Sequence, residues 1–117
     1  MMLLLQVANA SYRSQWIDKN VAAVMRLGYD GLNIDYEGNR HGAISGFTEL
    51  VVETATALRG NVSGAQLSID APGYAGFEFR DYDYLTIADS LDLMYYFNHI
   101  LFPRCGRGCR SRATSAA

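Results

Sequence analysis

Short apolar segments alternate with segments of helical periodicity along most of this chain, and this alternation limits the folds open to it. The expected strands are residues 3–8, 29–38, 66–71 and 91–97. The expected helices are residues 12–27 and 44–58, and residues 84–89 are expected to form a short helix or a turn. Gly28 and Gly60 stand where the first two helices are expected to end. Short strands separated by helices predict a parallel sheet, because parallel neighbours need a crossover connection. An open doubly wound sheet and about four β/α units of a TIM (β/α)8 barrel both satisfy this α/β pattern.

The size and composition indicate one globular domain. The 117 residues are 50% hydrophobic and carry a formal net charge of −2. A chain of this length can bury one core, and its near-neutral charge gives no reason to expect nucleic acid or a membrane as a partner. No apolar run approaches the length of a membrane-spanning helix. We interpret the apolar residues 1–8 as a strand rather than a signal peptide, because no basic residue precedes or interrupts them.

The end of the chain differs from the rest in composition. Four of the ten basic residues follow Pro103, and no acidic residue does: Arg104, Arg107, Arg110 and Arg112. We therefore expect a folded domain over residues 1–102 and a basic, poorly ordered tail over residues 103–117, with a docking role for the tail as the alternative. The only cysteines, Cys105 and Cys109, lie in this tail, where a local disulfide or two unpaired thiols are expected. Neither a metal site nor a cofactor is expected.

The strand expected over residues 29–38 is polar on one face. Side chains alternate between the two faces of a strand, so Asn33, Asp35 and Glu37 share a face. A buried parallel strand normally consists of continuous apolar residues instead. Both candidate architectures place active sites at the carboxyl ends of their strands, which is where this amide and these two acids lie. The alternative is a polar interior whose carboxylates are satisfied by arginine or backbone donors.

An eight-residue motif in this strand resembles the DGxDxDxE motif of glycoside hydrolase family 18, the chitinases and their relatives. It reads Asp30-Gly31-Leu32-Asn33-Ile34-Asp35-Tyr36-Glu37. The first internal Asp of the family motif is Asn33 here, a form similar to that of a lysosomal, exo-acting branch of the family. The resemblance covers roughly residues 9–97 and implies a partial TIM barrel.

The resemblance implies a glycosidase that cleaves β-1,4-linked N-acetylglucosamine in chitobiose or chitin oligosaccharides. In the family, the Glu at the Glu37 position is the general acid/base, and the residue at the Asp35 position orients the acetamido group of the substrate. The carbonyl of that group is the nucleophile, so hydrolysis is substrate-assisted and retaining. Further substrate contacts are expected from Asn33, from Tyr96 and from Asp70, which could instead cap the turn at Pro72-Gly73.

The chain departs from the family on the last expected strand. Members usually carry Met-x-Tyr-Asp there, and Met94-Tyr95-Tyr96 imitates Met-x-Tyr, but Phe97 stands at the Asp position. Counting without gaps from Asp89 instead places His99 at the Tyr position and Ile100 at the Asp position. The acid is missing in both alignments. A catalytically inactive fragment or a sugar-binding, lectin-like protein is therefore the alternative function.

Two further expectations concern the surroundings of the chain. The N-x-S sequons at Asn9 and Asn61 fit a lysosomal or secreted parent protein. A whole TIM barrel needs about 250 residues, so about four of its units would have unpaired sheet edges. Self-association through those edges is therefore possible.

Overall fold

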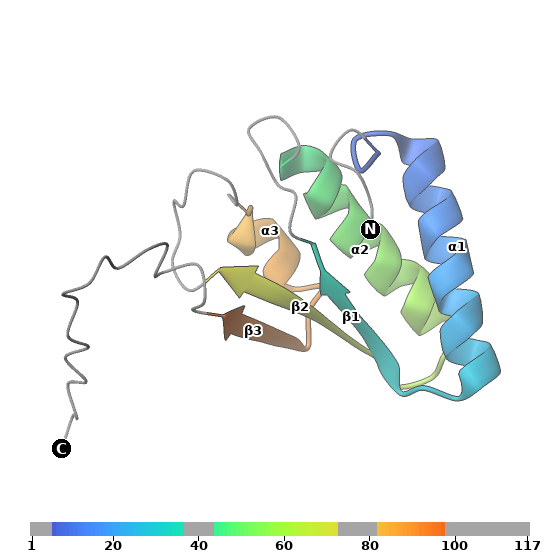
Figure 1. Ribbon diagram of the computed structural model, residues 1–117. Helices are drawn as coiled ribbons and strands as arrows, with labels where there is room; N and C mark the ends of the chain where they lie inside the picture. Colours follow the sequence, from blue (N-terminus) through green and yellow to red (C-terminus); the bar gives the residue numbers. More distant parts are fainter. Residues whose placement is uncertain (1–5, 37–43, 73–81, 98–117) are drawn as a thin grey trace, which may run out of the picture.

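The computed structural model describes residues 6–36, 44–72 and 82–97, where helices and strands alternate along the chain (Figure 1). In chain order they are α1 (Ala10–Leu27), β1 (Gly31–Asp35), α2 (Ile44–Asn61), β2 (Gln66–Pro72), α3 (Tyr84–Ala88) and β3 (Leu93–Phe97). The predicted alternation is confirmed for these six elements. Among the described helices, none combines the length and the apolar character needed to cross a membrane.

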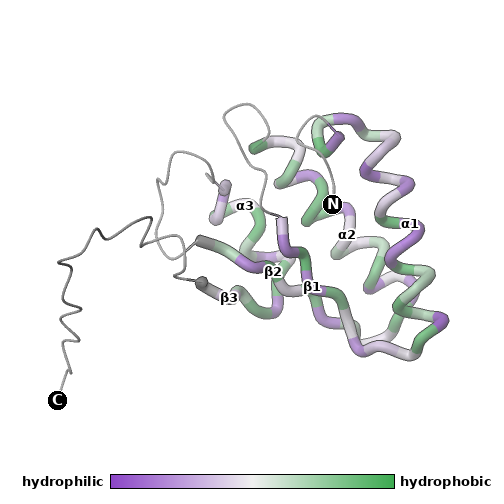
Figure 2. Tube along the Cα trace, viewed as in Figure 1, coloured by the Kyte–Doolittle hydropathy of each residue, from purple (hydrophilic) through white to green (hydrophobic). Residues whose placement is uncertain are grey.

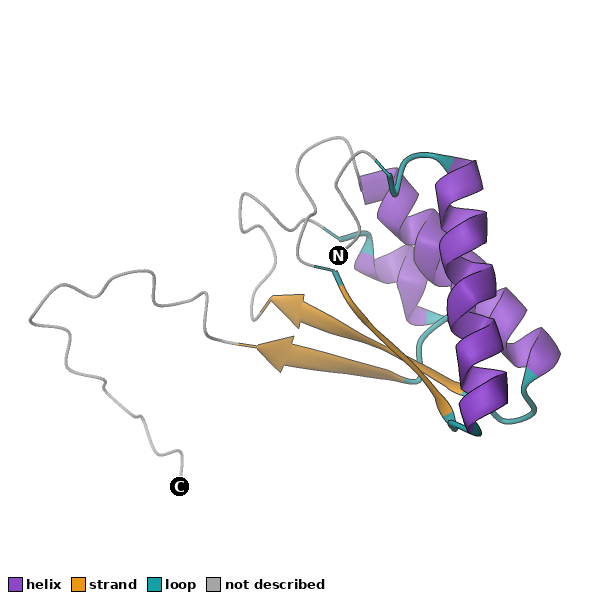
Figure 3. Cartoon of the chain, turned by 45° about the vertical axis from the view of Figure 1, so that its right-hand side comes forward, coloured by secondary structure: helices purple, strands orange, loops and turns teal. Residues whose placement is uncertain are grey.

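The described strands form one parallel sheet in the order β1-β2-β3. In its register, Asp35 pairs with Asp70, and Asp70 pairs with Tyr95. All three helices lie on the same side of the sheet, with α2 between α1 and α3 (Figures 1 and 3). The sheet therefore has one face covered by helices and one face without them, which we call the open face.

The hydrophobic core fills the space between the sheet and the helices. Ile34 of β1 and Ile69 of β2 are 3% and 0% exposed, and Phe47 of α2 is 1% exposed. Hydrophobic and hydrophilic residues alternate along α1 (Figure 2), and its buried positions Ile17 and Val21 are one helical turn apart. Burying each such side chain stabilises the fold by about 1.5–3 kcal/mol before conformational entropy is counted. Apolar burial on the covered face is thus the main force that holds helices and sheet together.

Both ends of α1 are capped by residues next to it in the sequence. The Oδ1 atom of Asn9 accepts hydrogen bonds from the backbone N–H of Ser11 at 2.9 Å and of Tyr12 at 3.4 Å. At the other end, Gly28 adopts a left-handed conformation with φ 69°, and its N–H donates to the carbonyl of Val24. The predicted helix end at Gly28 is confirmed.

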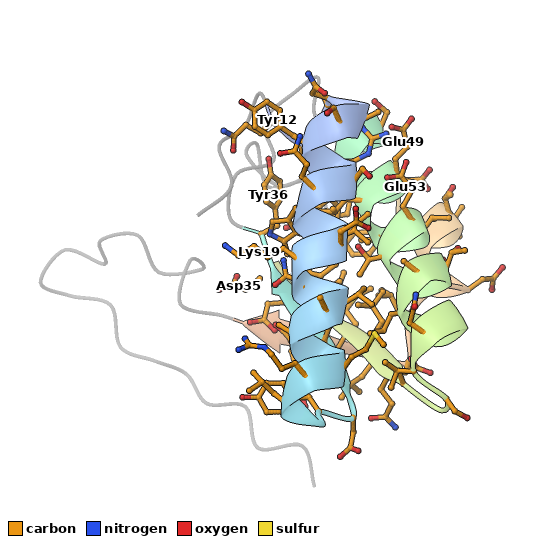
Figure 4. The ribbon with its side chains drawn as sticks, turned by 90° about the vertical axis from the view of Figure 1, so that its right-hand side faces the viewer. Tyr12, Lys19, Asp35, Tyr36, Glu49 and Glu53 are labelled. Atoms are coloured by element: carbon orange, nitrogen blue, oxygen red, sulfur yellow. The ribbon has the colours of Figure 1, made fainter. Side chains whose placement is uncertain are left out.

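Arg13 is a buried cation that joins α1 to α2. Its Nε and Nη2 atoms lie 3.1 and 3.0 Å from the two carboxylate oxygens of Glu53, and Nη2 lies 2.7 Å from Glu49. Its Nη1 donates to the carbonyl of Val7 at 3.0 Å. Hydrogen bonding to Glu53 raises the pKa of the guanidinium. Because the residue is only 4% exposed, these contacts replace the water that the charge gives up on folding. Glu49 and Glu53 are labelled in Figure 4.

The structure corrects three boundaries. Residues 6–8 form a turn, closed by a 3.1 Å hydrogen bond from the Asn9 N–H to the Gln6 carbonyl, and not part of a strand. β1 begins only at Gly31, because the N–H of Tyr29 still bonds to Val24 in the cap of α1. Gly60 lies inside α2, and Gly64, with φ 71°, is the left-handed residue that follows. The described part contains three of the roughly four predicted strands.

Candidate functional site

The side chains of β1 alternate between the core and the open face. Ile34 and the following Tyr36 are 3% and 6% exposed, whereas Asn33 and Asp35 are exposed. Figure 4 shows Asp35 on the side of β1 away from α2. The predicted division of this strand is therefore confirmed for its described residues. Glu37 lies outside them, and its predicted position remains a prediction.

The strand register brings polar residues of three strands into rows across the open face. Asn33 pairs with Ser68, and Asp35 pairs with Asp70, which pairs in turn with Tyr95. In-register residues of parallel neighbours project to the same face, about 4.8 Å apart along the hydrogen-bonding direction. Tyr95 is 55% exposed. Two carboxylates, an amide, a hydroxyl and an aromatic ring therefore share one surface.

The amide of Asn33 connects the first two strands on this surface. Its Nδ2 donates to Ser68 Oγ at 2.9 Å and to Asp70 Oδ1 at 3.2 Å. An aspartate at this position would offer only acceptors to the Asp70 carboxylate. The departure of Asn33 from the family motif is therefore matched by an acid on the neighbouring strand. This contact also places Asp70 on the open face.

Gly31 allows β1 and β2 to approach each other where the strands begin. A Cβ atom at this position would clash with the backbone carbonyl oxygen of Gln66. That residue is the register partner of Gly31, and its N–H donates to the carbonyl of Asp30 at 2.9 Å. Only glycine avoids the clash. The Gly31 of the motif thus has a structural reason that is independent of catalysis.

The carboxyl end of β1 is held by aromatic residues. The ring of Tyr36 stacks on Phe47 of α2, with centroids 5.3 Å apart and an interplanar angle of 17°. Tyr82 packs on the same Phe47 at 4.6 Å, and its hydroxyl donates to the backbone carbonyl of Tyr36 at 2.9 Å. Burial raises the pKa of the Tyr36 hydroxyl. Its oxygen has no hydrogen-bond partner among the described residues.

The last strand adds an aromatic side chain to the open face, that of Tyr95. Tyr95 pairs with Asp70 of that face, whereas Tyr96 pairs with Ala71, whose side chain is buried. The side chain of Tyr96 lies outside the description, so its substrate contact remains a prediction. Sequence reasoning missed Tyr95. The ungapped count from Asp89 places His99 at the Tyr position of the family motif. Side chains alternate along a strand, so Tyr95 would share a face with that position.

In residues 6–36, 44–72 and 82–97, no three His, Cys, Asp or Glu side chains gather in a way that could hold an ion. The tail cysteines and His99 lie outside these ranges.

Known proteins resemble the chain in sequence. It is 30% identical over 100 residues to di-N-acetylchitobiase of Rattus norvegicus, in an alignment that covers 82% of this chain and 27% of the relative. It is also 30% identical over 98 residues to probable di-N-acetylchitobiase 1 of Dictyostelium discoideum, covering 80% and 26%. No protein-family model matches the chain.

Solved structures resemble it in fold. The group IV chitinase of Ostrinia furnacalis, in complex with allosamidin, superposes with a TM-score of 0.68 at 22% identity, covering 80% of this chain and 26% of that one. Catalytic domain 2 of the group II chitinase from the same species, a variant in complex with penta-N-acetylchitooctaose, gives a TM-score of 0.70 at 22% identity, covering 79% and 26%. The chain is thus similar in sequence to di-N-acetylchitobiases and in fold to chitinases.

The likeness in fold to these chitinases explains the open face. The described helices and parallel strands are part of a TIM barrel. Helices surround the outside of such a barrel, so the face that α1, α2 and α3 leave open corresponds to its interior. Asp35 and Asp70 therefore lie on the inner side, near the carboxyl ends of their strands. The chain spans about a quarter of the length of the curated relatives it matches, 27% and 26%.

Proposed function

We propose that the chain carries the acidic part of the active site of a glycoside hydrolase that cleaves β-1,4-linked N-acetylglucosamine in chitobiose or chitin oligosaccharides. Glu37 is the general acid/base, and Asp35 orients the acetamido group of the sugar. Asn33, Asp70 and Tyr96 contribute substrate contacts. The two curated relatives are chitobiases by name, and one structural neighbour was solved with an N-acetylglucosamine oligomer. These names support the proposed substrate class.

The reaction proceeds through the acetamido group of the substrate. Its carbonyl oxygen attacks the anomeric carbon while the glycosidic C–O bond breaks, and Glu37 gives its proton to the leaving oxygen. Asp35 accepts a hydrogen bond from the acetamido N–H and balances the positive charge of the oxazolinium ion. Water then attacks the anomeric carbon and gives a proton to Glu37, while the bond between that carbon and the carbonyl oxygen breaks and the acetamido group is restored. The two displacements together retain the configuration.

One observation carries this proposal: Asp35 projects onto the open face at the end of β1, in register with Asp70. Glu37 follows two positions later, so an extended chain would continue the same row. Tyr95 borders the row on the third strand and offers an exposed ring. Sugar rings are recognised by such combinations of carboxylates and aromatic surface.

The test is release of a fluorophore from a chitobioside by the purified 117-residue chain. Glu37→Gln should lower kcat by about 10²–10⁴-fold, and Asp35→Asn should also lower it strongly. Asp18→Asn, which removes one acid from the exposed side of α1, is the charge-matched control and should leave the rate unchanged. Equal turnover by the wild type and Glu37→Gln would refute the catalytic assignment.

A sugar-binding protein without activity is the second candidate. It is favoured by the exposure of Asn33 and Asp35, which in the described part lie on a surface rather than in an enclosed pocket. Titration calorimetry with di-N-acetylchitobiose separates the two. Binding that Asp35→Asn abolishes, together with no turnover, would select this second function.

Two further proposals concern the self-association of the chain and its location. In the described sheet, β1 and β3 each pair with β2 alone, so each can accept another strand, and we expect association at high concentration in size-exclusion chromatography with light scattering. Substitution of Thr56, which is exposed on α2, should not change it. The exposed sequon residues Asn9 and Asn61 fit a lysosomal or secreted location.

A further inference from the structure

We infer that Tyr82 is a positioning residue, which fixes the peptide unit from which the general acid Glu37 projects. This inference rests on the proposed function and deepens it. Tyr82 lies 46 positions from Tyr36 in the sequence, just before α3, and its hydroxyl donates to the Tyr36 carbonyl through a buried 2.9 Å hydrogen bond. No feature of the motif in residues 30–37 requires this distant residue.

Covalent geometry transmits the contact to Glu37. The carbonyl of Tyr36 belongs to the peptide unit that ends at the amide nitrogen and Cα of Glu37. The six atoms of a peptide unit lie close to one plane, and rotation about its C–N bond has a barrier of about 18–20 kcal/mol. A donor that fixes the carbonyl oxygen therefore also fixes the direction in which the Glu37 Cα follows.

Packing makes Tyr82 an effective anchor. The side chain is 6% exposed, and its ring lies 4.6 Å from Phe47 and 5.7 Å from Tyr84, tilted by 45° and 76°. Phe47 also stacks on Tyr36. The ring and the carbonyl of Tyr36 are therefore held by the same cluster, from α2 on one side and from the segment before α3 on the other.

The placement matters because β1 ends at Asp35. In the described sheet, the register of β1 with β2 runs as far as the Asp35–Asp70 pair. Beyond it, the Tyr82 hydroxyl takes the place of a ladder donor for Tyr36. A misplacement of about 1 Å in a catalytic group can cost about 10²-fold in rate, so loss of this donor should be visible in turnover.

Tyr82→Phe is the decisive variant, because it removes the hydroxyl and keeps the ring. We expect kcat for the chitobioside to fall by about tenfold or more while KM stays within about twofold, since the substrate contacts are unchanged. Tyr84→Phe is the matched control: it removes another buried hydroxyl of the same cluster, one that does not contact the Tyr36 carbonyl, and kcat should stay at the wild-type value.

A second measurement does not depend on activity. In nuclear magnetic resonance spectra, Tyr82→Phe should move the ¹³C′ resonance of Tyr36 and the ¹⁵N resonance of Glu37 and lower the heteronuclear NOE of Glu37, whereas Tyr84→Phe should not. Unchanged resonances and order at these two atoms in Tyr82→Phe would overturn the inference, as would unchanged kcat in an active protein. Absence of Glu37-dependent turnover in the wild type would overturn the proposed function alone.

Discussion

The side-chain amide of Asn33 donates to the carboxylate of Asp70 across 3.2 Å and so connects β1 to β2 on the open face of the sheet. The same nitrogen donates to Ser68 at 2.9 Å. This relationship explains how the chain accommodates an amide where its family motif has an acid. It also makes the pair testable by exchange of the two residues.

Asn33→Asp should destabilise the fold by about 1 kcal/mol at neutral pH, because a donor is replaced by a carboxylate facing Asp70. Like charges in proximity favour protonation, so the difference from wild type should shrink as the pH is lowered. Urea denaturation at several pH values measures this. The exchange variant, Asn33→Asp with Asp70→Asn, restores one amide and one acid and should recover most of the loss. An exchange variant as unstable as Asn33→Asp would contradict the pairing.

Gly31→Ala should destabilise the protein by about 3 kcal/mol, because the added methyl group overlaps the backbone carbonyl of Gln66 and the strands must separate. Gly60→Ala is the matched control. A Cβ there meets no atom within 4 Å, and in a helix the change should stabilise by roughly 0.5–1 kcal/mol. Thermal unfolding followed by circular dichroism measures both. Destabilisation of similar size in the two variants would show that the β1–β2 approach is not the cause.

Arg13→Ala should cost about 3 kcal/mol, because it removes a buried cation and leaves the Val7 carbonyl and two carboxylates without their donor. Glu53→Gln should cost only about 0.5 kcal/mol, since its side chain is 43% exposed and water replaces the lost charge contact. Chemical denaturation of both variants gives the comparison. Equal losses would mean that the burial of Arg13 does not govern the energy of this contact.

Asp92 should make stability depend on pH. Its carboxylate accepts the Leu67 N–H at 2.8 Å and lies 3.0 Å from Arg59, and the first of these contacts is the larger cause of a pKa below the ordinary 3.8. A depressed folded-state pKa contributes stability that is fully present above the unfolded value and is lost as pH falls through the folded value.

The Tm of Asp92→Asn should therefore lie below that of the wild type at neutral pH, and the two should converge in acid, once the pH falls below the folded-state pKa of Asp92. Asp18→Asn, on the exposed side of α1, is the control, and its difference from wild type should not follow this course. A constant gap between Asp92→Asn and wild type at all pH values would exclude the proposed linkage.

Local patterns predicted much of the fold. The alternation of β1 placed Ile34 and Asp35 on opposite faces correctly, because a strand has a period of two whatever surrounds it. The end of α1 at Gly28 was predictable because a left-handed cap favours glycine. The predicted helix end at Gly60 was wrong, because glycine can also lie inside a helix. The left-handed residue that follows α2 is Gly64 instead.

Contacts between distant segments were not predictable from these patterns. Arg13 looks like a surface residue of an amphipathic helix, and only the packing of α1 on α2 places it between Val7 and two glutamates. The bond from Tyr82 to the Tyr36 carbonyl depends on how the segment before α3 returns to the end of β1. The register of β3 decides that Tyr95 pairs with Asp70. Strand alternation indicates only the face on which a side chain lies, not that register.

The exposure of the open face has a consequence for the strength of every charge on it. In contact with water, Asn33, Asp35 and Asp70 act through a high dielectric constant, where a pair of unit charges 4 Å apart is worth only about 1 kcal/mol. Whatever comes to cover these residues, sugar or polypeptide, lowers that dielectric constant and strengthens the same contacts several-fold. The carboxylates of Asp35 and Asp70 would then interact with their surroundings more strongly than they do in contact with water.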